Sequence, residues 1–142
     1  MDIRYRKIFI IIIVLITFSL FYGCNKGNNN ERETSIRDDY ITYKGNFESI
    51  ISLFPDDDYY KITSENYDKS NNNLCLIFEE LQYSKIYSDY KGNVFFDKFG
   101  DGLSFHGLVY LKSPEYVIGI PKTKSEYISE DKKWCVHYAH GL

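Results

Sequence analysis

The sequence predicts an α+β fold, with two short helices packed on one face of a small antiparallel meander sheet. In the first half of the chain, two segments carry apolar residues at i, i+3, i+4 and i+7, which is the spacing of one helical face. After Gln82 the apolar period changes to two, in aromatic and β-branched segments that short hairpin-type connections separate. Helices followed by strands, without an internal repeat, are typical of this fold class.

The first helix is predicted over Phe47–Phe54, between an N-cap at Asn46 and the proline that follows the segment. Its apolar stripe consists of Phe47, Ile50, Ile51 and Phe54. The second helix is predicted over 74–81, with Asn73 as its N-cap. Its stripe consists of Leu74, Ile77, Phe78 and Leu81. Because residues 74–78 form an unbroken apolar run, a buried strand is the alternative interpretation of that segment.

The second half of the chain is expected to form most of the sheet. The expected strands are 59–63, 85–90, 94–99, 103–111, 116–120 and 134–138, with a charged connection over 122–133. In the strand 103–111, odd-numbered and even-numbered side chains face opposite ways. We expect the set that includes Phe105 and Val109 to meet the helices, which leaves the even-numbered set on a helix-free face.

That helix-free face is the candidate binding surface, because one face of an antiparallel sheet stays open unless a partner covers it. Its proposed residues are Tyr87, His106, Tyr110 and Tyr138. The expected partner is a protein or, because the leader described next indicates export, an envelope polymer.

The first residues of the 142-residue chain form a leader of distinct composition. A basic cluster over 4–7 precedes an almost unbroken apolar run over 8–22, which is the build of a secretion signal. Gly23 and Cys24 close this run. A small residue directly before such a cysteine resembles the lipobox of bacterial lipoproteins, in which the cysteine becomes the lipid-modified first residue of the mature chain. The resemblance implies a signal peptide over 1–23 and acylation of Cys24, for example with palmitate.

The resemblance covers the leader only and departs from the family pattern at Phe21 and Tyr22, where the family prefers an aliphatic and a small residue. Two alternatives therefore remain. An uncleaved transmembrane helix needs about 20 apolar residues, and a soluble secretion signal needs small residues one and three positions before the cut. With a lipid anchor, a transmembrane helix or a soluble secretion signal alike, the remaining chain is exported.

A lipid anchor implies a membrane-anchored protein of the cell envelope that faces away from the cytoplasm. Asn25 follows the cysteine, and because an Asp there favours the inner membrane in Gram-negative lipoproteins, the resemblance implies the outer membrane where one exists. Residues 24–38 are expected to be the lipidated cysteine and a flexible tether, since they are almost free of apolar side chains. Residues 39–142 are expected to form a single domain.

The chain carries 17 basic against 20 acidic residues, for a net charge of −3. A mildly acidic domain has no electrostatic reason to bind nucleic acid. We therefore expect no nucleic-acid partner.

Lipidation of Cys24 leaves two further cysteines, Cys75 and Cys135. An exported compartment permits a disulfide between them, and closing a loop of about 60 residues is worth about 4 kcal/mol in the loop-entropy model. The alternative is that both are small buried hydrophobic residues.

The weak metal candidates are His106, Cys135, His137 and His140. Because their spacing lacks paired C-x-x-C units, we expect no metal and no cofactor. The chain has no G-x-S-x-G, P-loop or H-E-x-x-H motif, so we assign no catalytic residue.

The leading hypothesis is a lipid-anchored, non-catalytic binding module. One alternative is an envelope hydrolase or metal-dependent enzyme using Cys135, His137 and His106, and another is an immunity or inhibitor lipoprotein.

Overall fold

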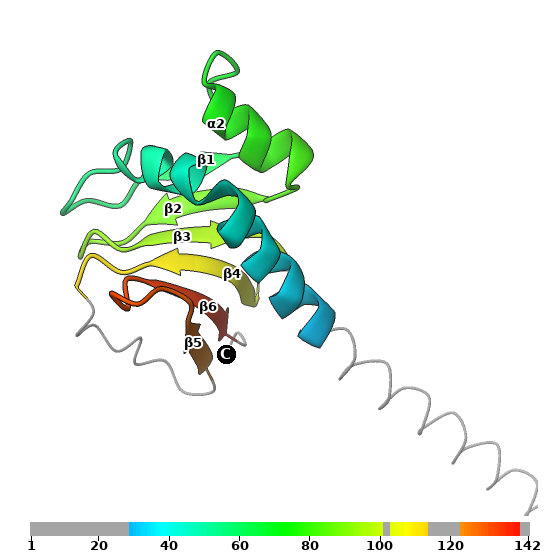
Figure 1. Cartoon of the computed structure of the whole chain (residues 1–142). Coiled ribbons are helices and arrows are strands. Elements are labelled where there is room, and N and C mark those ends of the chain that lie inside the picture. Colours follow the sequence, from blue (N-terminus) through cyan, green and yellow to red (C-terminus); the bar gives the residue numbers. More distant parts are fainter. Residues whose placement is uncertain (1–28, 101–102, 114–122, 140–142) are drawn as a thin grey trace, which may run out of the picture. The chain divides into compact units, whose positions relative to one another are not determined.

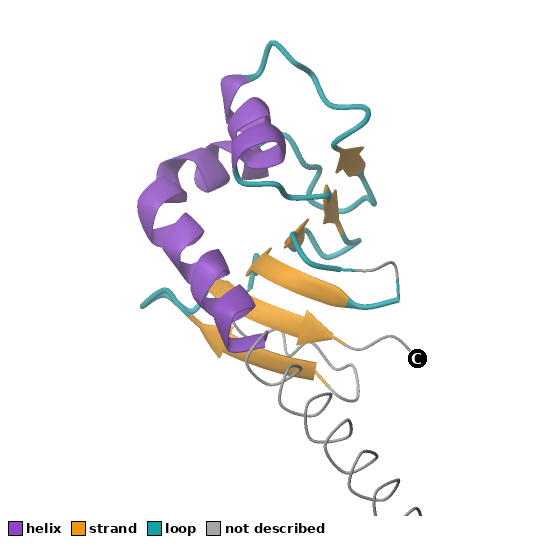
Figure 2. Cartoon of the chain, turned by 90° about the vertical axis from the view of Figure 1, so that its right-hand side faces the viewer, coloured by secondary structure: helices purple, strands orange, loops and turns teal. Residues whose placement is uncertain are grey.

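The computed structural model describes residues 29–100, 103–113 and 123–139 (Figure 1). The chain divides into two compact units, Met1–Thr34 and Ser35–Leu142. The second unit has helices on one side of a six-stranded antiparallel sheet, as Figure 2 shows. This confirms the predicted α+β class. Within the described residues, no helix is both long and apolar enough to cross a membrane.

The first helix covers residues 29–51 and is much longer than the predicted segment Phe47–Phe54. Residues 29–38, which we expected to belong to a flexible tether, are helical, and Ile36 is fully buried. The stripe of Ile50 and Phe47, three residues apart, continues upstream to Tyr40 after seven residues and to Ile36 after four more. Burial of Ile36 and Tyr40 on this face therefore stabilises the upstream part of the helix, although Ile41 is exposed.

The second helical segment is α2, Asn72–Cys75, which continues directly into a π-helical turn, η1, Leu76–Glu80. A helix is therefore correct here and the strand alternative is wrong. The N-cap is Asn71 rather than Asn73, since the Asn71 side chain accepts hydrogen bonds from the backbone of Asn73 and Leu74. Asn73 Oδ1 instead accepts a hydrogen bond of 2.8 Å from Asn46 Nδ2, so the two asparagines predicted as caps join the two helices.

The sheet has the strand order β1-β2-β3-β4-β6-β5, and every neighbouring pair is antiparallel. The strands are β1 Lys61–Thr63, β2 Lys85–Ser88, β3 Val94–Asp97, β4 Phe105–Tyr110, β5 Thr123–Tyr127 and β6 Trp134–Ala139. Strand β5 corrects our expectation of a connection over 122–133. It pairs with the outer edge of β6, so β6 lies between β4 and β5. The predicted strand 116–120 lies outside the described residues.

The helices pack on the sheet face opposite to the one predicted. Leu108 of β4 and Val136 of β6 belong to the same buried cluster as the helix residues, whereas Phe105 and Val109 belong to a second cluster on the other face. Alternation divides a strand into two sets but does not say which set meets the helices. The neighbouring strands determine which set of β4 side chains meets the helices, because the pairing of β4 with β6 places Tyr110 beside Trp134 on the helix side.

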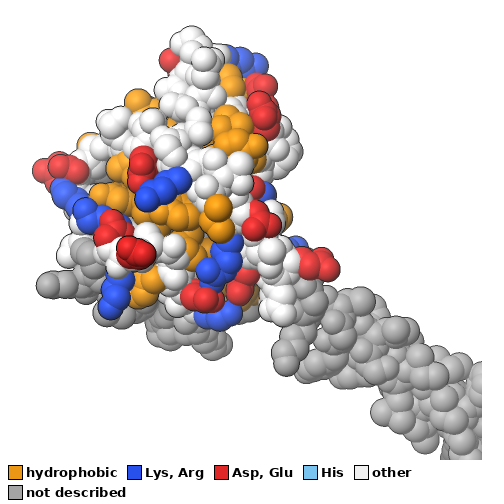
Figure 3. Space-filling view, in the orientation of Figure 1, with side chains coloured by type: hydrophobic (Ala, Val, Ile, Leu, Met, Phe, Trp, Pro, Cys, Tyr) orange, Lys and Arg blue, Asp and Glu red, His pale blue; other side chains and the backbone are white. Residues whose placement is uncertain are grey.

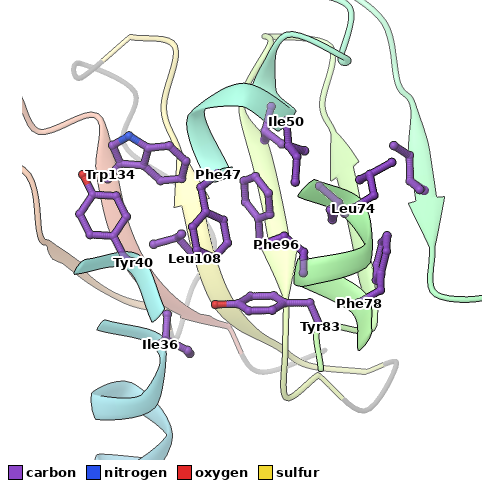
Figure 4. Close-up of a cluster of buried hydrophobic side chains, with 14 of the residues drawn as sticks. Ile36, Tyr40, Phe47, Ile50, Leu74, Phe78, Tyr83, Phe96, Leu108 and Trp134 are labelled. Carbon is purple, nitrogen blue, oxygen red and sulfur yellow. The ribbon is translucent and has the colours of Figure 1, made fainter. Parts of the chain in front are cut away.

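The main core is aromatic, and its side chains converge from the helices and the sheet in Figure 4. Phe47 of the first helix lies at its centre, with its ring 5.1 Å from Phe96 and 6.3 Å from Trp134, both in edge-to-face geometry. Tyr40 lies 5.3 Å from Trp134. Edge-to-face contacts of this kind add to the stabilisation that burial of the rings provides.

Candidate functional site

The four residues of the predicted binding face do not share one face. His106 pairs with Tyr138 across β4 and β6, and both belong to the helix side together with Tyr110. Tyr87 belongs to the opposite face, where it packs against Phe95. The helix side is the packed interior of the domain, and His106 itself is only 1% exposed. The predicted surface is therefore wrong as a continuous binding face.

The helix-free face carries a row of aromatic rings instead. Tyr87 stacks on Phe95 with ring centroids 4.9 Å apart, and Phe95 meets Phe105 edge to face at 5.7 Å. Tyr59 lies 6.4 Å from Tyr87 and is 49% exposed. Most of this row is buried or half-buried, because Phe105 is 8% exposed and its neighbours belong to the second apolar cluster. Among the described residues of this row, the most exposed rings are at the end formed by Tyr59 and Tyr90, which is 72% exposed and lies 6.5 Å from Tyr59.

The residues of the enzyme alternative are also divided between the two faces. Cys135 and His137 point to the helix-free face, while His106 points to the helix side. Burial raises the pKa of the Cys135 thiol to about 12, so it is a neutral thiol near neutral pH and a weak nucleophile. His140 lies outside the described residues. Within residues 29–100, 103–113 and 123–139, no three His, Cys, Asp or Glu side chains gather closely enough to hold a metal ion.

His137 instead forms a hydrogen bond with Ser125 on the adjacent edge strand. Ser125 Oγ lies 2.7 Å from His137 Nδ1, and β5 places the two residues directly opposite each other. The His137 ring is 2% exposed and lies 5.7 Å from the Phe105 ring. Burial, aided by the nearby His106, lowers the pKa of His137 to about 4. The imidazole is therefore neutral near neutral pH, and its hydrogen bond with Ser125 gives this buried polar side chain a partner.

This neutral histidine predicts a specific loss of stability in acid. Its pKa is about 4 in the folded protein against an ordinary value of 6.5, so the unfolded chain takes up the proton first as the pH falls. The neutral His137 side chain makes its full contribution to the free energy of unfolding above pH 6.5. As the pH falls from 6.5 to 4, this free energy decreases by up to about 3 kcal/mol. Urea unfolding at about pH 7.5 and about pH 4.5 measures this loss.

Carboxyl groups also titrate in this range, so His137→Gln provides the comparison. The variant keeps a hydrogen-bonding side chain opposite Ser125 but does not titrate. We expect its stability to fall less steeply than that of the native protein between the two pH values. Equal slopes for the two proteins would contradict the assignment.

The disulfide that the sequence left open is absent from the described residues. Cys75 and Cys135, the two cysteines that the structure describes, are both free thiols. Cys75 belongs to α2 on the helix side, and its thiol donates a hydrogen bond of 3.3 Å to the backbone oxygen of Lys69. Cys135 is fully buried in the cluster on the other face of the sheet. The sheet separates the two sulfur atoms, so a bridge would require the domain to open.

A pocket of about 340 Å³ lies where the end of the first helix, β1 and α2 meet. Figure 1 shows β1 and α2 close together at this end of the sheet. Its walls are partly apolar: Ile62 and Leu74 are buried side chains of the core, while Leu53 is 42% exposed and Tyr60 is 50% exposed. The remaining lining residues are Lys61, Asn66, Tyr67, Asp68 and Asn71. This volume is at the small end of the range for ligand pockets.

Internal hydrogen bonds hold the three short polar side chains of the pocket in place. Asn66 Oδ1 accepts from the backbone nitrogen of Thr63 at 2.7 Å, and Asp68 Oδ1 accepts from the Ser70 hydroxyl at 2.7 Å. Asn71 Oδ1 caps α2. In the part of the chain that the structure describes, the amide nitrogens of Asn66 and Asn71 and the second oxygen of Asp68 bond to no protein group. The hydrogen bonds within the loop therefore fix the orientation of these two amide nitrogens and this carboxylate oxygen, which remain available to a ligand.

Two tyrosines complete the pocket. The Tyr67 hydroxyl donates a hydrogen bond to Glu79, and its ring lies 5.0 Å from Phe78. This hydrogen bond raises the pKa of Tyr67, so the phenol stays protonated. Tyr60 packs edge to face on Phe54 at 5.8 Å. Both rings are therefore positioned by the core, while parts of them remain accessible.

Sequence reasoning missed this pocket. The segment expected as a strand over 59–63 contains β1, and the polar residues that follow it form a loop only as far as Asn71, since Asn72 and Asn73 belong to α2. The remaining signal was the run Asn66 to Asn71, in which each short polar side chain can bond to its own backbone. Such a run predicts turns, but it does not predict that the turns surround a cavity.

The fold and the site define a small α+β protein with an open pocket at one end of an antiparallel sheet. Comparison of this chain with models of protein families, with curated proteins and with solved structures gave no match.

Proposed function

We propose that this protein is a small lipid-anchored protein of the cell envelope whose α+β domain binds a ligand and does not catalyse a reaction. The anchor rests on the sequence alone: a basic cluster, an apolar run and the Gly23–Cys24 pair that resembles a lipobox. In this proposal the lipid holds the chain at a membrane on the side facing away from the cytoplasm.

The observation that carries the binding role is the pocket of about 340 Å³ beside β1. It combines apolar walls with a few fixed polar groups, and this combination is typical of sites that recognise small ligands. Exposed apolar side chains adjoin it, including Leu53 and Tyr60. Figure 3 shows hydrophobic side chains gathered in the middle of one face of the protein, with charged side chains of both signs around them.

The enzyme alternative has weaker support, for two reasons of geometry and charge. The buried Cys135 thiol has a pKa of about 12, and the His137 imidazole beside it has a pKa of about 4. A nucleophile and base pair requires a thiolate or an imidazole able to accept a proton near neutral pH. His106, the third group, belongs to the other sheet face.

Acylation of Cys24 is the first test. We expect radiolabelled palmitate to enter the native protein, the labelled protein to fractionate with membranes, and mass spectrometry to find the acyl groups on residue 24. Cys24→Ala is expected to abolish the label completely, because no other residue can replace the modified thiol. Cys75→Ala is the matched control and should keep the label, since Cys75 is a free thiol of α2. An intact Met1 on an unacylated protein in the soluble lysate would refute the anchor.

A further inference from the structure

We propose that the pocket beside β1 binds a neutral sugar, either free or as the terminal unit of a glycan. The inference rests on the proposed binding function and names the ligand class of the same site. It follows from three features of the pocket: its donors and acceptors, its balance of charge and its aromatic and aliphatic walls.

The hydrogen-bonding groups of the pocket are of both kinds. The amide nitrogens of Asn66 and Asn71 are donors, and the second oxygen of Asp68 is an acceptor. Asp68 is ionised near neutral pH, because hydrogen bonds from Ser70 lower the pKa of its carboxyl group. A sugar hydroxyl donates and accepts at once, so adjacent hydroxyls can bridge an amide donor and a carboxylate acceptor. A ligand with acceptors alone would leave the carboxylate without a donor.

The charge of the pocket disfavours ions. Lys61 and Asp68 both line the pocket. The Asp68 carboxylate would therefore repel an anion, and the Lys61 ammonium group would repel a cation. Both side chains are exposed, so each charge is partly screened and a neutral polar ligand meets neither repulsion. A purely apolar ligand would cover the Asn66 and Asn71 amides without bonding to them.

The walls fit the less polar side of a sugar ring. The Tyr67 ring is fixed by Phe78 and by Glu79, and aliphatic side chains of Ile62 and Leu74 close the inner end. The face of an aromatic ring carries a negative partial charge and attracts the weakly positive C–H groups of a sugar. At this small volume the pocket suits one ring or a terminal unit rather than the length of a chain.

Amide NMR titration of the full chain tests the proposal, in a detergent whose headgroup is not a sugar. The probes are glucose, galactose, N-acetylglucosamine and the linear trimer of N-acetylglucosamine, with glycine and inorganic phosphate as charged comparisons. We expect at least one sugar to shift the side-chain amide signals of Asn66 and Asn71 and the backbone signals of Ile62 and Leu74, with saturation in the millimolar range. Tighter binding of the trimer than of the single sugar would identify a glycan end as the source.

Two variants locate the binding. Leu53→Trp places a large ring at the partly exposed mouth of the pocket and should weaken sugar binding about tenfold or more. Ile41→Trp is the matched control, because Ile41 is 75% exposed on the first helix and does not line the pocket. It should bind as the native protein does. Asp68→Asn keeps an oxygen for Ser70 but replaces the free acceptor with a donor, and should weaken binding about tenfold.

Several results would overturn the proposal. Absence of any shift with all four sugars would do so, as would shifts of the pocket signals by glycine or phosphate at lower concentration than by the sugars. Unchanged sugar affinity in Leu53→Trp would place the ligand elsewhere. If that variant does not fold, Asp68→Asn decides alone, because Asp68 lies on an exposed loop. None of these results bears on Cys24 acylation, so a failure here is distinct from a failure of the anchor.

Discussion

Gly107→Ala is expected to destabilise the domain by at least about 3 kcal/mol. Gly107 lies in β4 directly opposite Asp97 of β3. A Cβ atom at this position would overlap the backbone oxygen of Phe96 and come within 2.9 Å of its carbonyl carbon. These are backbone atoms of the neighbouring strand, so no side chain can rotate away. The strands would have to separate in the middle of the sheet, which also disturbs the buried Asp97 carboxylate.

Gly45→Ala is the matched control and should have the opposite sign. Gly45 lies within the first helix, and a Cβ atom there would meet no atom within 4 Å. Alanine in a helix interior is favoured over glycine by about 1 kcal/mol, so this variant should be slightly more stable than the native protein. Trp134, the one tryptophan of the chain, is 2% exposed and reports unfolding in urea by its fluorescence. Equal stability of Gly107→Ala and the native protein would contradict the close approach of β3 and β4.

The second large effect is expected at Asp39. Asp39 Oδ2 accepts a hydrogen bond of 2.6 Å from Lys98 Nζ, and the side chains of this ion pair are only 13% and 10% exposed. The hydroxyl of Tyr83 donates a further bond of 3.1 Å to the same oxygen. Burial, reinforced by Asp39, raises the pKa of Tyr83 well above its usual value. One carboxylate oxygen thus joins the first helix to the segment after β3 and to the segment before β2.

Asp39→Ala should cost about 2 to 3 kcal/mol, because the largely buried Lys98 ammonium group loses its charged partner and keeps the bond to Ser35 Oγ, while the buried Tyr83 hydroxyl loses its acceptor. Asp38→Ala is the control, since Asp38 is the exposed neighbour on the same helix, and its effect should stay within about 0.5 kcal/mol. The double variant with Asp39→Leu and Lys98→Met should recover much of the loss, because no buried charge then lacks a partner. Urea unfolding of these three variants and of the native protein measures the differences. A loss in Asp38→Ala as large as in Asp39→Ala would refute the role of the ion pair.

The strands β2, β3, β4 and β6 could be predicted to within a few residues, because each is rich in aromatic and β-branched residues. Strand β5 could not. Thr123–Tyr127 is an edge strand whose residues 124–127 are exposed, so no apolar period marks it. The start of the first helix was missed for a related reason. The pattern predicts an N-cap at Asn46, yet burial of Ile36 and Tyr40 stabilises a helix that continues through this position.

The candidate site was predicted least well, because it depends on which residues meet across the chain. The four residues of the expected binding face were assigned to one surface by counting along separate strands. Register then placed Tyr87 on one face and His106 with Tyr138 on the other. The choice between a Cys75–Cys135 bridge and two free thiols depended on the same information, since thiols on the two sides of a sheet cannot meet.

By itself the sequence determined the class of fold, the apolar stripes of the two helices and most of the strands, because apolar periodicity follows directly from the geometry of a helix or a strand. It is also the sole basis for the proposed anchor at Cys24. Only the tertiary structure decided which sheet face the helices cover, where the buried ion pair lies and that the loop before α2 helps to form a pocket. Those features depend on contacts between residues that are distant along the chain, and local pattern carries no information about such contacts.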